Sequence, residues 1–339
     1  MSRPTPITPL AAAPADMLAL RVHGYGPGEA PRLDTLPLPP CGPGEVRVRV
    51  QACGISFVDL LLASGGYQVR PTPPFVPGSE FSGVVDAAGP GAGLKVGDRV
   101  CGTRQGAWAQ YIVLPADRVH PLPAEACALE GAVLVAPYAT ALHALRDRAQ
   151  LAAGETVLVL GATGSVGHAA VQLAKVLGAR VIAAASSPAK RSAAREAGAD
   201  EVVDSSGDWK DQVKALAGPP GVDVVVDTVG GEATDPAFRT LGWGGRHLMV
   251  GFAGGQIAAL KTNLAIVKGA ALLGVDFRQA VEREPQRAAA AKQDVLALHA
   301  AGRIRPRIHA VLPFDRFPEA AALVRDRATL GRVLLTLPE

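Results

Sequence analysis

The sequence predicts an α/β protein in which a six-stranded, doubly wound parallel sheet is inserted into a second, β-rich domain. In the second half of the chain, short apolar runs alternate with helical segments, as in a parallel sheet that is covered on both faces. In the first half, the segment 45–50 alternates strictly between polar and apolar residues, and glycine and proline punctuate the chain. This second pattern is typical of antiparallel strands joined by turns.

Composition sets the outer limits of the prediction. The 339 residues, with 48% hydrophobic content and a formal net charge of +3, suffice for two domains with their own cores. We expect no nucleic-acid partner, because the chain has no basic block or aromatic-interleaved basic stripe. We expect no membrane partner either, because no apolar run reaches the length of a membrane span.

The N-terminal residues are rich in proline and alanine and lack the uninterrupted apolar core of a secretory signal. We therefore expect residues 1–16 to be a disordered extension and the protein to be cytoplasmic. The cysteines are widely spaced, which argues against a disulfide framework or a cysteine zinc cluster. They are expected to be small buried side chains.

The β-rich domain is expected to comprise residues 17–137 and 278–339. Its strand 45–50 would present alternate side chains to a core and to solvent. Three segments near the C-terminus are expected to return to this domain, namely 312–317, a helix over 318–327 and a strand over 331–337. The parallel sheet would occupy residues 138–277.

Residues 157–167 are expected to form a strand, a glycine turn and the start of a helix. Val157–Leu160 is a short apolar run of the kind found in a buried parallel strand. Helical spacing begins after Ser165, and Gly178 is the expected C-cap.

The turn reads Ala-x-Gly-x-x-Gly, in which Ala162 replaces the first glycine of the dinucleotide-binding fingerprint. Gly164 would let the backbone approach a pyrophosphate, and Gly167 would let the helix pack against the strand. Together with Gly164 and Gly167, the helix start at Ser165 and Val166 would offer free N–H groups to the anion.

The second strand of this unit, Arg180–Ala184, bears on which dinucleotide is expected. An NAD-binding unit carries an Asp or Glu near the end of this strand to hold the ribose 2′-hydroxyl, but no carboxylate appears before Glu196. Two hydroxyls and two cations stand there instead: Ser186, Ser187, Lys190 and Arg191. They suit a 2′-phosphate and predict NADPH. The alternative is that the serines cap a helix and the cations are solvated.

Further strands are predicted at four places: 201–203, 222–227, 246–251 and 271–276. They complete a sheet whose ligand crosses the carboxyl ends of the strands. Thr228, Gly251 and Phe252 follow such ends and are predicted to contact the cofactor, although turn and packing chemistry would explain each of them equally well.

Several motifs match, in order and spacing, a family of known enzymes. They lie at 52–59, 77–85, 95–100, 107–111, 139–141, 227–231 and 250–252, with the Gly164 turn among them. From about Met17 to its C-terminus the chain resembles the medium-chain dehydrogenases/reductases, and within them the zinc-independent, zeta-crystallin-like NADPH:quinone oxidoreductases. The resemblance implies a GroES-like catalytic domain around a Rossmann domain.

The resemblance also raises the question of zinc. Zinc-dependent members carry a Cys at the position of Ser56 and a His at the position of Ser79. Of these three positions only Glu80 then keeps a side chain that can bind zinc, whereas a catalytic zinc needs about three ligands from the protein. The four-cysteine lobe expected after 97–100 is missing as well. The sequence therefore predicts no metal.

Other roles are implied by position in the family. Asp59 would approach the nicotinamide and ribose, and Ser56 and Phe252 would line the substrate pocket. Tyr67 is the candidate proton donor. Further cofactor contacts are implied for Thr140, Ser205, Asn263 and Arg332. Alternatives stay open: Asp59 could start a helix, Thr140 could bond its own backbone, and Tyr67 could pack on the domain surface.

Without zinc no Lewis acid polarises an alcohol oxygen, so the expected reaction is hydride delivery from NADPH to a small, already electrophilic acceptor. A quinone is the expected acceptor, and an α,β-unsaturated carbonyl or an enoyl-CoA thioester is the alternative. A thioester enzyme should show a basic patch for the carrier phosphates, for which Arg303, Arg305 and Arg307 are the candidates. The rival class is a non-catalytic NADPH-binding protein.

Family members usually dimerise by pairing the last strand of the nucleotide-binding sheet edge to edge. In this chain that strand is 271–276, whose apolar sequence suits an edge that needs covering. The resemblance therefore implies a homodimer.

Overall fold

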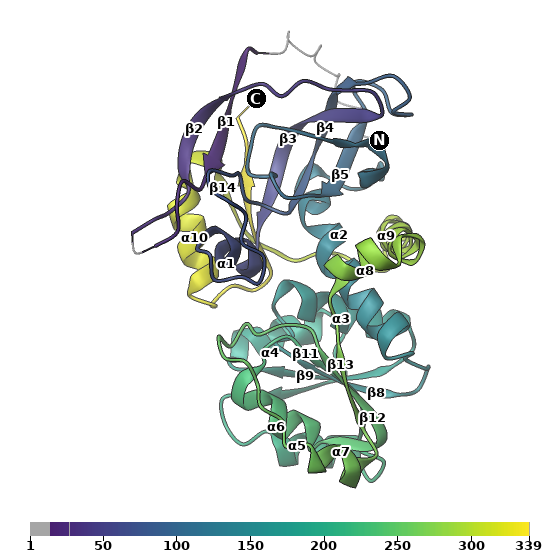
Figure 1. Ribbon diagram of the computed structural model, residues 1–339. Helices are drawn as coiled ribbons and strands as arrows, with labels where there is room; N and C mark the ends of the chain where they lie inside the picture. Colours follow the sequence, from purple (N-terminus) through teal and green to yellow (C-terminus); the bar gives the residue numbers. More distant parts are fainter. Residues whose placement is uncertain (1–13, 27, 339) are drawn as a thin grey trace.

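The predicted parallel sheet is present in the computed structural model, which describes residues 14–26 and 28–338 (Figure 1). Its strand order is β10-β9-β8-β11-β12-β13, and all neighbouring strands are parallel. The strands are β8 (Thr156–Leu160), β9 (Arg180–Ala185), β10 (Glu201–Asp204), β11 (Val222–Asp227), β12 (Leu241–Met249) and β13 (Ala271–Gly274). The order reverses next to β8, so the doubly wound fold class is confirmed.

Helices cover both faces of this sheet (Figure 1). They are α3 (Ser165–Val176), α4 (Pro188–Glu196), α5 (Lys210–Ala217), α6 (Thr234–Phe238) and α7 (Asn263–Lys268), with a 3-10 turn η3 (Gly231–Ala233) before α6. Within β8, Val157 and Val159 belong to one hydrophobic core, whereas Leu158 and Leu160 belong to another. Burial on both faces explains why the strand is a continuous apolar run.

Two strands of the parallel sheet, β12 and β13, differ from their predicted bounds by more than one residue. β12 begins at Leu241 rather than at 246, because Gly242 and Gly245 interrupt the apolar pattern without interrupting the strand. β13 ends at Gly274, and Asp276 instead caps α8 (Phe277–Arg283) by accepting a hydrogen bond from the Gln279 N–H at 3.1 Å.

The β-rich domain is a seven-stranded sheet with the order β14-β15-β3-β4-β5-β7 and with β6 paired to β3. Its strands are β3 (Glu45–Ile55), β4 (Glu80–Ala88), β5 (Arg99–Thr103), β6 (Tyr111–Pro115), β7 (Val119–Pro121), β14 (Ile308–Pro313) and β15 (Arg332–Thr336). In β3, buried and half-buried residues alternate from 45 to 50, as predicted. β1 (Asp16–Arg21) and β2 (Arg32–Pro37) form a separate antiparallel pair.

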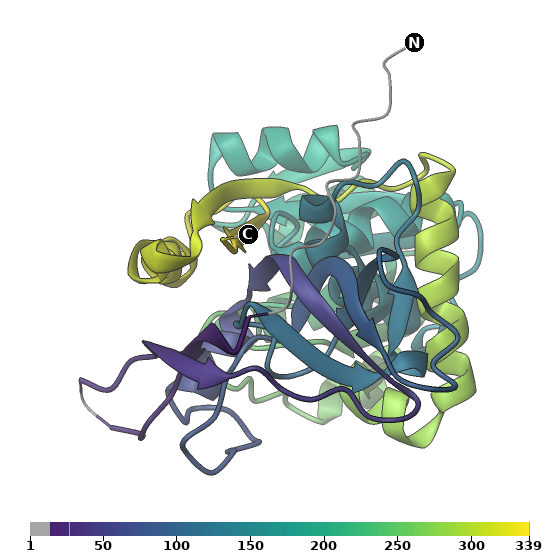
Figure 2. The same ribbon diagram turned by 90° about the horizontal axis from the view of Figure 1, so that it is seen from above.

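The remaining helices of this part are α1 (Phe57–Ala63), α9 (Pro285–Ala300) and α10 (Phe317–Arg325), with short 3-10 turns η1 (Ala116–Arg118) and η4 (Phe314–Arg316). Figure 2 shows α9 and α10 on opposite sides of the molecule. The segment predicted at 312–317 is therefore the end of β14 followed by η4.

Two expectations about the N-terminal half need correction. Of the predicted extension 1–16, residues 1–13 lie outside the described part, and Asp16 already pairs with Pro37 in the β1–β2 ribbon. Cys53 and Cys101 are buried as expected, but Cys41 is half-buried, and Cys127, the N-cap residue that precedes a helix, is exposed.

That helix, α2 (Ala128–Leu142), continues as the π-helical η2 (His143–Arg148) and lies between the two domains (Figure 1). Its N-terminal half packs against β3 and β15, and its C-terminal half joins the core of the parallel-sheet domain. The predicted domain boundary at 137/138 thus falls inside one helix. By length and composition the 21-residue stretch Ala128–Arg148 could cross a membrane, but 78% of its apolar window is buried in the protein, as in a core helix.

Candidate active site

The glycine turn connects β8 to α3 at the carboxyl edge of the parallel sheet, where Gly164 is the N-cap of the helix. A Cβ on Gly167 would lie 2.1 Å from the carbonyl oxygen of Gly161, so only glycine allows this approach of helix and strand. The fingerprint pattern did not single out Gly161, whose φ of +65° requires glycine. The first N–H groups of α3 have no helical acceptor and face the edge where a pyrophosphate is expected.

Thr228 and Phe252 lie on two loops at the same carboxyl edge. The Thr228 hydroxyl donates to the carbonyl oxygen of Leu160 at 3.0 Å, which ties the end of β11 to the end of β8. The Phe252 ring packs on Gly230, where a Cβ would lie 2.6 Å from the ring. Thr228, Gly251 and Phe252 are therefore brought together beside the glycine turn.

The four residues predicted to bind a 2′-phosphate lie past the end of β9. Ser187 caps α4 by accepting the Lys190 N–H at 3.3 Å, while Ser186 is exposed. Arg191 pairs with Asp204 at 2.8 Å, so its charge is already compensated. Among the described residues no carboxylate pairs with the Lys190 ammonium, which donates to the carbonyl oxygen of Arg327 at 2.8 Å.

Ser205, also predicted at the adenosine side, follows β10 at the same edge. Its N–H donates to the carbonyl oxygen of Ala185 at 3.3 Å. Ser205 is thus held next to the end of β9, close in the chain to the Asp204 that pairs with Arg191.

Arg327, which no sequence pattern indicated, lies in the loop between α10 and β15. Its backbone has φ +53°, uncommon for a residue other than glycine. Its guanidinium donates to the carbonyl oxygen of Gly254 at 3.2 Å and lies 5.5 Å from the centre of the Phe57 ring. Arg327 therefore links both domains beside Lys190. The sequence offered only one signal for this role, a cation in a short loop before Gly331. A loop has no periodic pattern, so this signal could not be distinguished from an ordinary surface residue.

On the catalytic-domain side, Ser56 and Asp59 form a capping box at the start of α1. The Asp59 carboxylate accepts from the Ser56 N–H at 2.8 Å and from the Ser56 hydroxyl at 2.5 Å, and Asp59 is buried. The carboxylate thus takes part in starting the helix through its Oδ2, in agreement with the alternative interpretation of Asp59.

Tyr67 lies in the loop after α1 and is half-buried. Burial raises the pKa of its hydroxyl, as does the nearby Asp276 carboxylate, and Arg278 opposes them in part. Tyr67 consequently keeps its proton at neutral pH and is available as a hydrogen-bond donor.

The structure does not support two predicted cofactor contacts. The Thr140 hydroxyl donates to the carbonyl oxygen of Ala136 at 2.8 Å, within its own helix. Asn263 does not lie in a loop over the cofactor; it is the first residue of α7, which ends at Lys268 beside the amino end of β12. The connection between Met249 and Asn263 contains no helix or strand, so no pattern in the sequence indicated where Asn263 lies.

The position of the family's zinc site holds an ion pair. Glu80 is fully buried; it accepts from the Ala136 N–H at 2.8 Å and from Arg332 Nη2 at 2.8 Å. Burial raises the pKa of Glu80 to about 7, although Arg332 and the Ala136 N–H oppose the shift. With hydroxyls at Ser56 and Ser79 and a carboxylate already engaged, these residues do not fit a zinc ion.

Arg332, for which the family resemblance implied a cofactor contact, is therefore already paired with Glu80, but it lies close to the glycine turn. Arg332 and Ser165 line one small cavity, and the Gly331 N–H donates to the carbonyl oxygen of Thr163 at 3.1 Å. The Nε of Arg332 is buried and has no hydrogen-bond partner in the part of the chain that the structure describes.

The arginines considered for a carrier-phosphate patch are largely compensated. Arg305 pairs with Glu130 at 3.0 Å, and Arg307 pairs with Glu196 at 2.6 Å. The patch therefore gives no specific support to an enoyl-CoA substrate.

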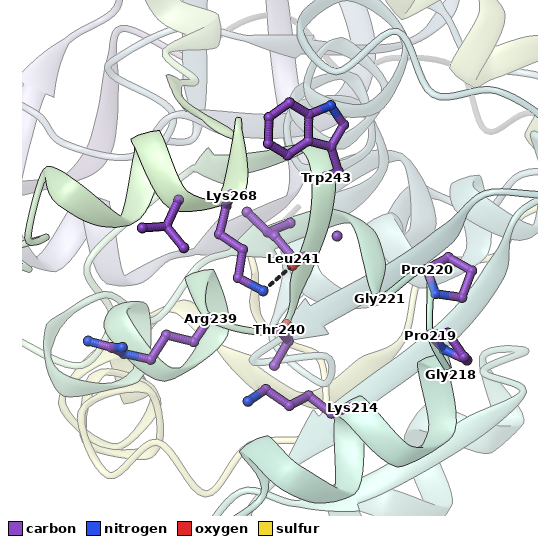
Figure 3. Close-up of a pocket in the computed structure, with 12 residues that line it drawn as sticks. Lys214, Gly218, Pro219, Pro220, Gly221, Arg239, Thr240, Leu241, Trp243 and Lys268 are labelled. Atoms are coloured by element: carbon purple, nitrogen blue, oxygen red, sulfur yellow. Dashed lines mark hydrogen bonds between the residues drawn. The ribbon is translucent and has the colours of Figure 1, made fainter.

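A separate pocket of about 350 Å³ lies at the amino edge of the sheet (Figure 3). Trp243 forms one side of it, and Lys268 donates to the carbonyl oxygen of Leu241 at 2.6 Å. Since it lies at the starts of β11 and β12, this pocket is distinct from the carboxyl-edge site.

A nucleotide-binding sheet with a glycine turn, facing a β-rich domain whose metal position is an ion pair, defines a two-domain nicotinamide-nucleotide oxidoreductase. The chain matches the family model for an alcohol dehydrogenase GroES-like domain over residues 42–124 and that for a zinc-binding dehydrogenase over residues 165–293. It is 38% identical to quinone oxidoreductase-like protein 2 of Rattus norvegicus over 302 residues, covering 88% of this chain and 86% of that one. It is 31% identical to quinone oxidoreductase of Sus scrofa over 329 residues, covering 95% and 98%.

Among solved structures, the quinone oxidoreductase of Thermus thermophilus, also described in complex with NADPH, superposes with a TM-score of 0.84 at 32% identity. It covers 95% of this chain and 100% of that one. The chain belongs to the medium-chain dehydrogenase/reductase family, in which its relatives include quinone oxidoreductases. The family resemblance found in the sequence is confirmed.

Proposed function

We propose that this protein is a zinc-independent NADPH:quinone oxidoreductase. The observation that carries the proposal is the buried Glu80–Arg332 pair at the metal position, beside a glycine turn that requires Gly161 and Gly167. The names of the relatives support a quinone as the acceptor. An acceptor that is already electrophilic needs no Lewis acid, which agrees with this residue set.

The residues present fit NADPH. The N-terminus of α3, from Gly164 to Gly167, would hold the pyrophosphate, and Thr228 and Gly251 would flank the nicotinamide half. Lys190, with Arg327 and the Ser186 and Ser187 hydroxyls nearby, would hold the 2′-phosphate. Bound NADPH supplies a hydride from C4 of its nicotinamide.

The protein itself contributes orientation, exclusion of water and a proton. A quinone becomes a hydroquinone by taking up one hydride and one proton, so an O–H donor is needed near the acceptor oxygen. Tyr67 is the candidate, because its raised pKa keeps it protonated. Phe252, packed on Gly230, would form an apolar wall of the acceptor pocket.

Turnover of purified protein with a panel of acceptors tests the function. NADPH oxidation would be measured with ortho- and para-quinones, simple enones and enoyl-CoA thioesters. Quinone preference is the expected result. Preference for enones or thioesters would retain the mechanism and replace the substrate class, whereas NADPH binding without turnover on any acceptor would favour a non-catalytic protein.

The cofactor preference gives a sharper prediction. Lys190→Ala should raise the KM for NADPH about tenfold or more, because a charge-assisted contact to the 2′-phosphate is lost, and should leave the KM for NADH unchanged. Arg195→Ala, an exposed cation on the same helix, is the matched control. An unchanged NADPH/NADH ratio in Lys190→Ala would remove the phosphate assignment.

Proton delivery gives a second prediction. Tyr67→Phe should lower kcat with a quinone roughly 100-fold, since one positioned proton donor is lost, while the Kd for NADPH stays constant. Because the pKa of Tyr67 lies above its ordinary value of 10.0, tyrosine ionisation should not reduce the wild-type rate up to pH 9. Full activity of Tyr67→Phe would exclude this role.

We also propose that the protein is a homodimer through β13. β13 is an edge strand, and Leu272 on it and Ile266 on the preceding helix are exposed, at 48% and 81%. Sedimentation should give the mass of two chains, and Leu272→Arg should give one. Val96→Arg, exposed in the other domain, should leave the mass unchanged.

A cytoplasmic location is the accompanying proposal. The apolar helix formed by α2 and η2 is a core helix of both domains, which supports it. Recovery of the protein in the membrane fraction of broken cells would contradict it.

A further inference from the structure

Asp227, at the carboxyl end of β11, is a fully buried carboxylate with four hydrogen-bond partners. Its Oδ1 accepts from the N–H groups of Val229 at 2.9 Å and Gly230 at 2.8 Å. Its Oδ2 accepts from the Thr234 hydroxyl at 2.7 Å and lies 3.1 Å from His247 Nε2. Burial alone would raise the pKa of Asp227, but the hydrogen bonds from His247, Gly230 and Thr234 outweigh it and hold the pKa below its ordinary value.

His247, on the neighbouring strand β12, has this carboxylate as its hydrogen-bonding partner. The side chain is fully buried, and its Nδ1 has no partner within the described residues. Since a carboxylate can only accept, Nε2 carries the proton and donates. The Phe238 ring stacks on the imidazole at 5.8 Å and fixes its plane.

The carboxylate shapes the turn that follows β11. Gly230 and Gly231 have φ angles of +70° and +59°, and the two N–H groups held by Asp227 lie in this turn. This turn also holds the loop after β12, because the Ala253 N–H donates to the carbonyl oxygen of Thr228 at 3.1 Å. The Gly254 N–H likewise donates to the carbonyl oxygen of Val229 at 2.7 Å.

One buried hydrogen-bond network thus sets both loops that carry Thr228, Gly251 and Phe252. Since the groups for the adenosine phosphate lie past β9, on the other side of β8, these loops face the nicotinamide half of the cofactor.

We propose that His247, acting through Asp227, is a positioning residue for the nicotinamide half of the dinucleotide. The inference rests on the proposed function, because it requires a cofactor across this edge of the sheet. Loss of the Nε2 donor leaves one carboxylate oxygen short of a partner in a site without water access, so the carboxylate and its turn relax together. The effect is independent of the adenosine 2′-phosphate.

Cofactor binding by His247 variants tests the proposal. The Kd values for NADPH and NADH would be measured by nucleotide fluorescence with wild type, His247→Leu and His247→Gln. His247→Leu should weaken both cofactors at least tenfold and by the same factor, unlike Lys190→Ala, which should affect NADPH alone. His247→Gln, whose amide can donate from a position near Nε2, should recover most of the affinity.

Thr240→Val is the control for a general effect of removing a buried hydrogen bond. It removes a buried hydroxyl that donates to the carbonyl oxygen of Ala237 outside the network, and it should leave both Kd values unchanged. If His247→Leu does not fold, Thr234→Val removes the second donor to the same oxygen and should weaken both cofactors.

The outcomes separate this inference from the proposed function. Wild-type protein that binds neither cofactor overturns both. If the wild-type protein binds the cofactors and the folded His247→Leu or Thr234→Val variant binds them with the same Kd, only the positioning role is overturned. Equal loss in His247→Leu and His247→Gln would also overturn it, because the donor would then not matter.

Discussion

Gly167→Ala is expected to abolish measurable NADPH binding and to lower the free energy of unfolding by roughly 3 kcal/mol. The added Cβ would lie 2.1 Å from the Gly161 carbonyl oxygen and 2.8 Å from its carbonyl carbon. Both are backbone atoms in a turn whose own φ of +65° is already restricted, so no side chain can move aside. The start of α3 would have to move away from β8, and its N–H groups would no longer converge on one anion.

Two other glycines provide the controls for this prediction. Gly207→Ala should change nothing, because no atom lies within 4 Å of the added Cβ. Gly164→Ala should leave thermal stability nearly constant, since its Cβ would lie 3.4 Å from the nearest atom, but it should weaken NADPH binding because the Cβ narrows the approach to the pyrophosphate. Wild-type melting temperature and Kd in Gly167→Ala would contradict the assigned geometry.

Arg332→Met is expected to cost about 3–5 kcal/mol of unfolding free energy at pH 8, because it leaves the Glu80 carboxylate buried and without its cation. The double variant Glu80→Gln/Arg332→Met should recover most of this loss, since neither charge then remains in the core. Chemical unfolding of wild type and of these two variants measures both effects. A full-sized loss in the double variant would mean that the packing of Arg332, rather than the ion pair, stabilises the fold.

The Glu80 pair also predicts a pH dependence. The folded-state pKa of about 7 lies above the ordinary 4.5, so the folded protein binds this proton more tightly than the unfolded chain does. The contribution of Glu80 is therefore fully present below about pH 4.5 and is lost as pH rises through 7, by about 3 kcal/mol in total. Unfolding from pH 5 to 8 should show this slope in wild type, and Glu80→Gln should remove it.

The double variant also tests whether Arg332 contacts the cofactor. Its Nε is buried, and the side chain shares a cavity with Ser165 at the start of α3. A weakened NADPH Kd in the folded double variant would support the contact predicted from the sequence, and an unchanged Kd would leave the ion pair as its role.

Local sequence patterns predicted most of the fold, because the strands and turns concerned depend on residues that are close together in the sequence. The apolar run at 157–160 has to be a strand covered on both faces, and the alternation at 45–50 has to be a half-exposed one. The glycine turn was readable because the approach of α3 to β8 admits no side chain at Gly167. Where glycine replaced apolar residues, as at Gly242 in β12, the pattern failed although the strand continued.

The candidate site was predicted only in part. The residues at the carboxyl ends of strands, such as Thr228 and Phe252, were found because parallel strands bring their ends to one edge. The sequence left open whether Asp59 starts a helix or contacts the cofactor, and it did not predict the pairing of Arg191 with Asp204. Both outcomes depend on which side chains the fold places within hydrogen-bonding distance. Asn263 was misplaced because a long connection gives no signal of its path.

The sequence by itself determined the two-domain architecture, the glycine turn and the absence of a zinc ligand set at Ser56 and Ser79, because these depend on residue type and local spacing. Only the tertiary structure decided the partners of the buried charges. Glu80 meets Arg332 across 252 residues of chain, and Asp227 meets His247 from an adjacent strand. A buried charge must find a partner to offset its desolvation, and which partner it finds depends on how distant segments pack rather than on any pattern along the chain.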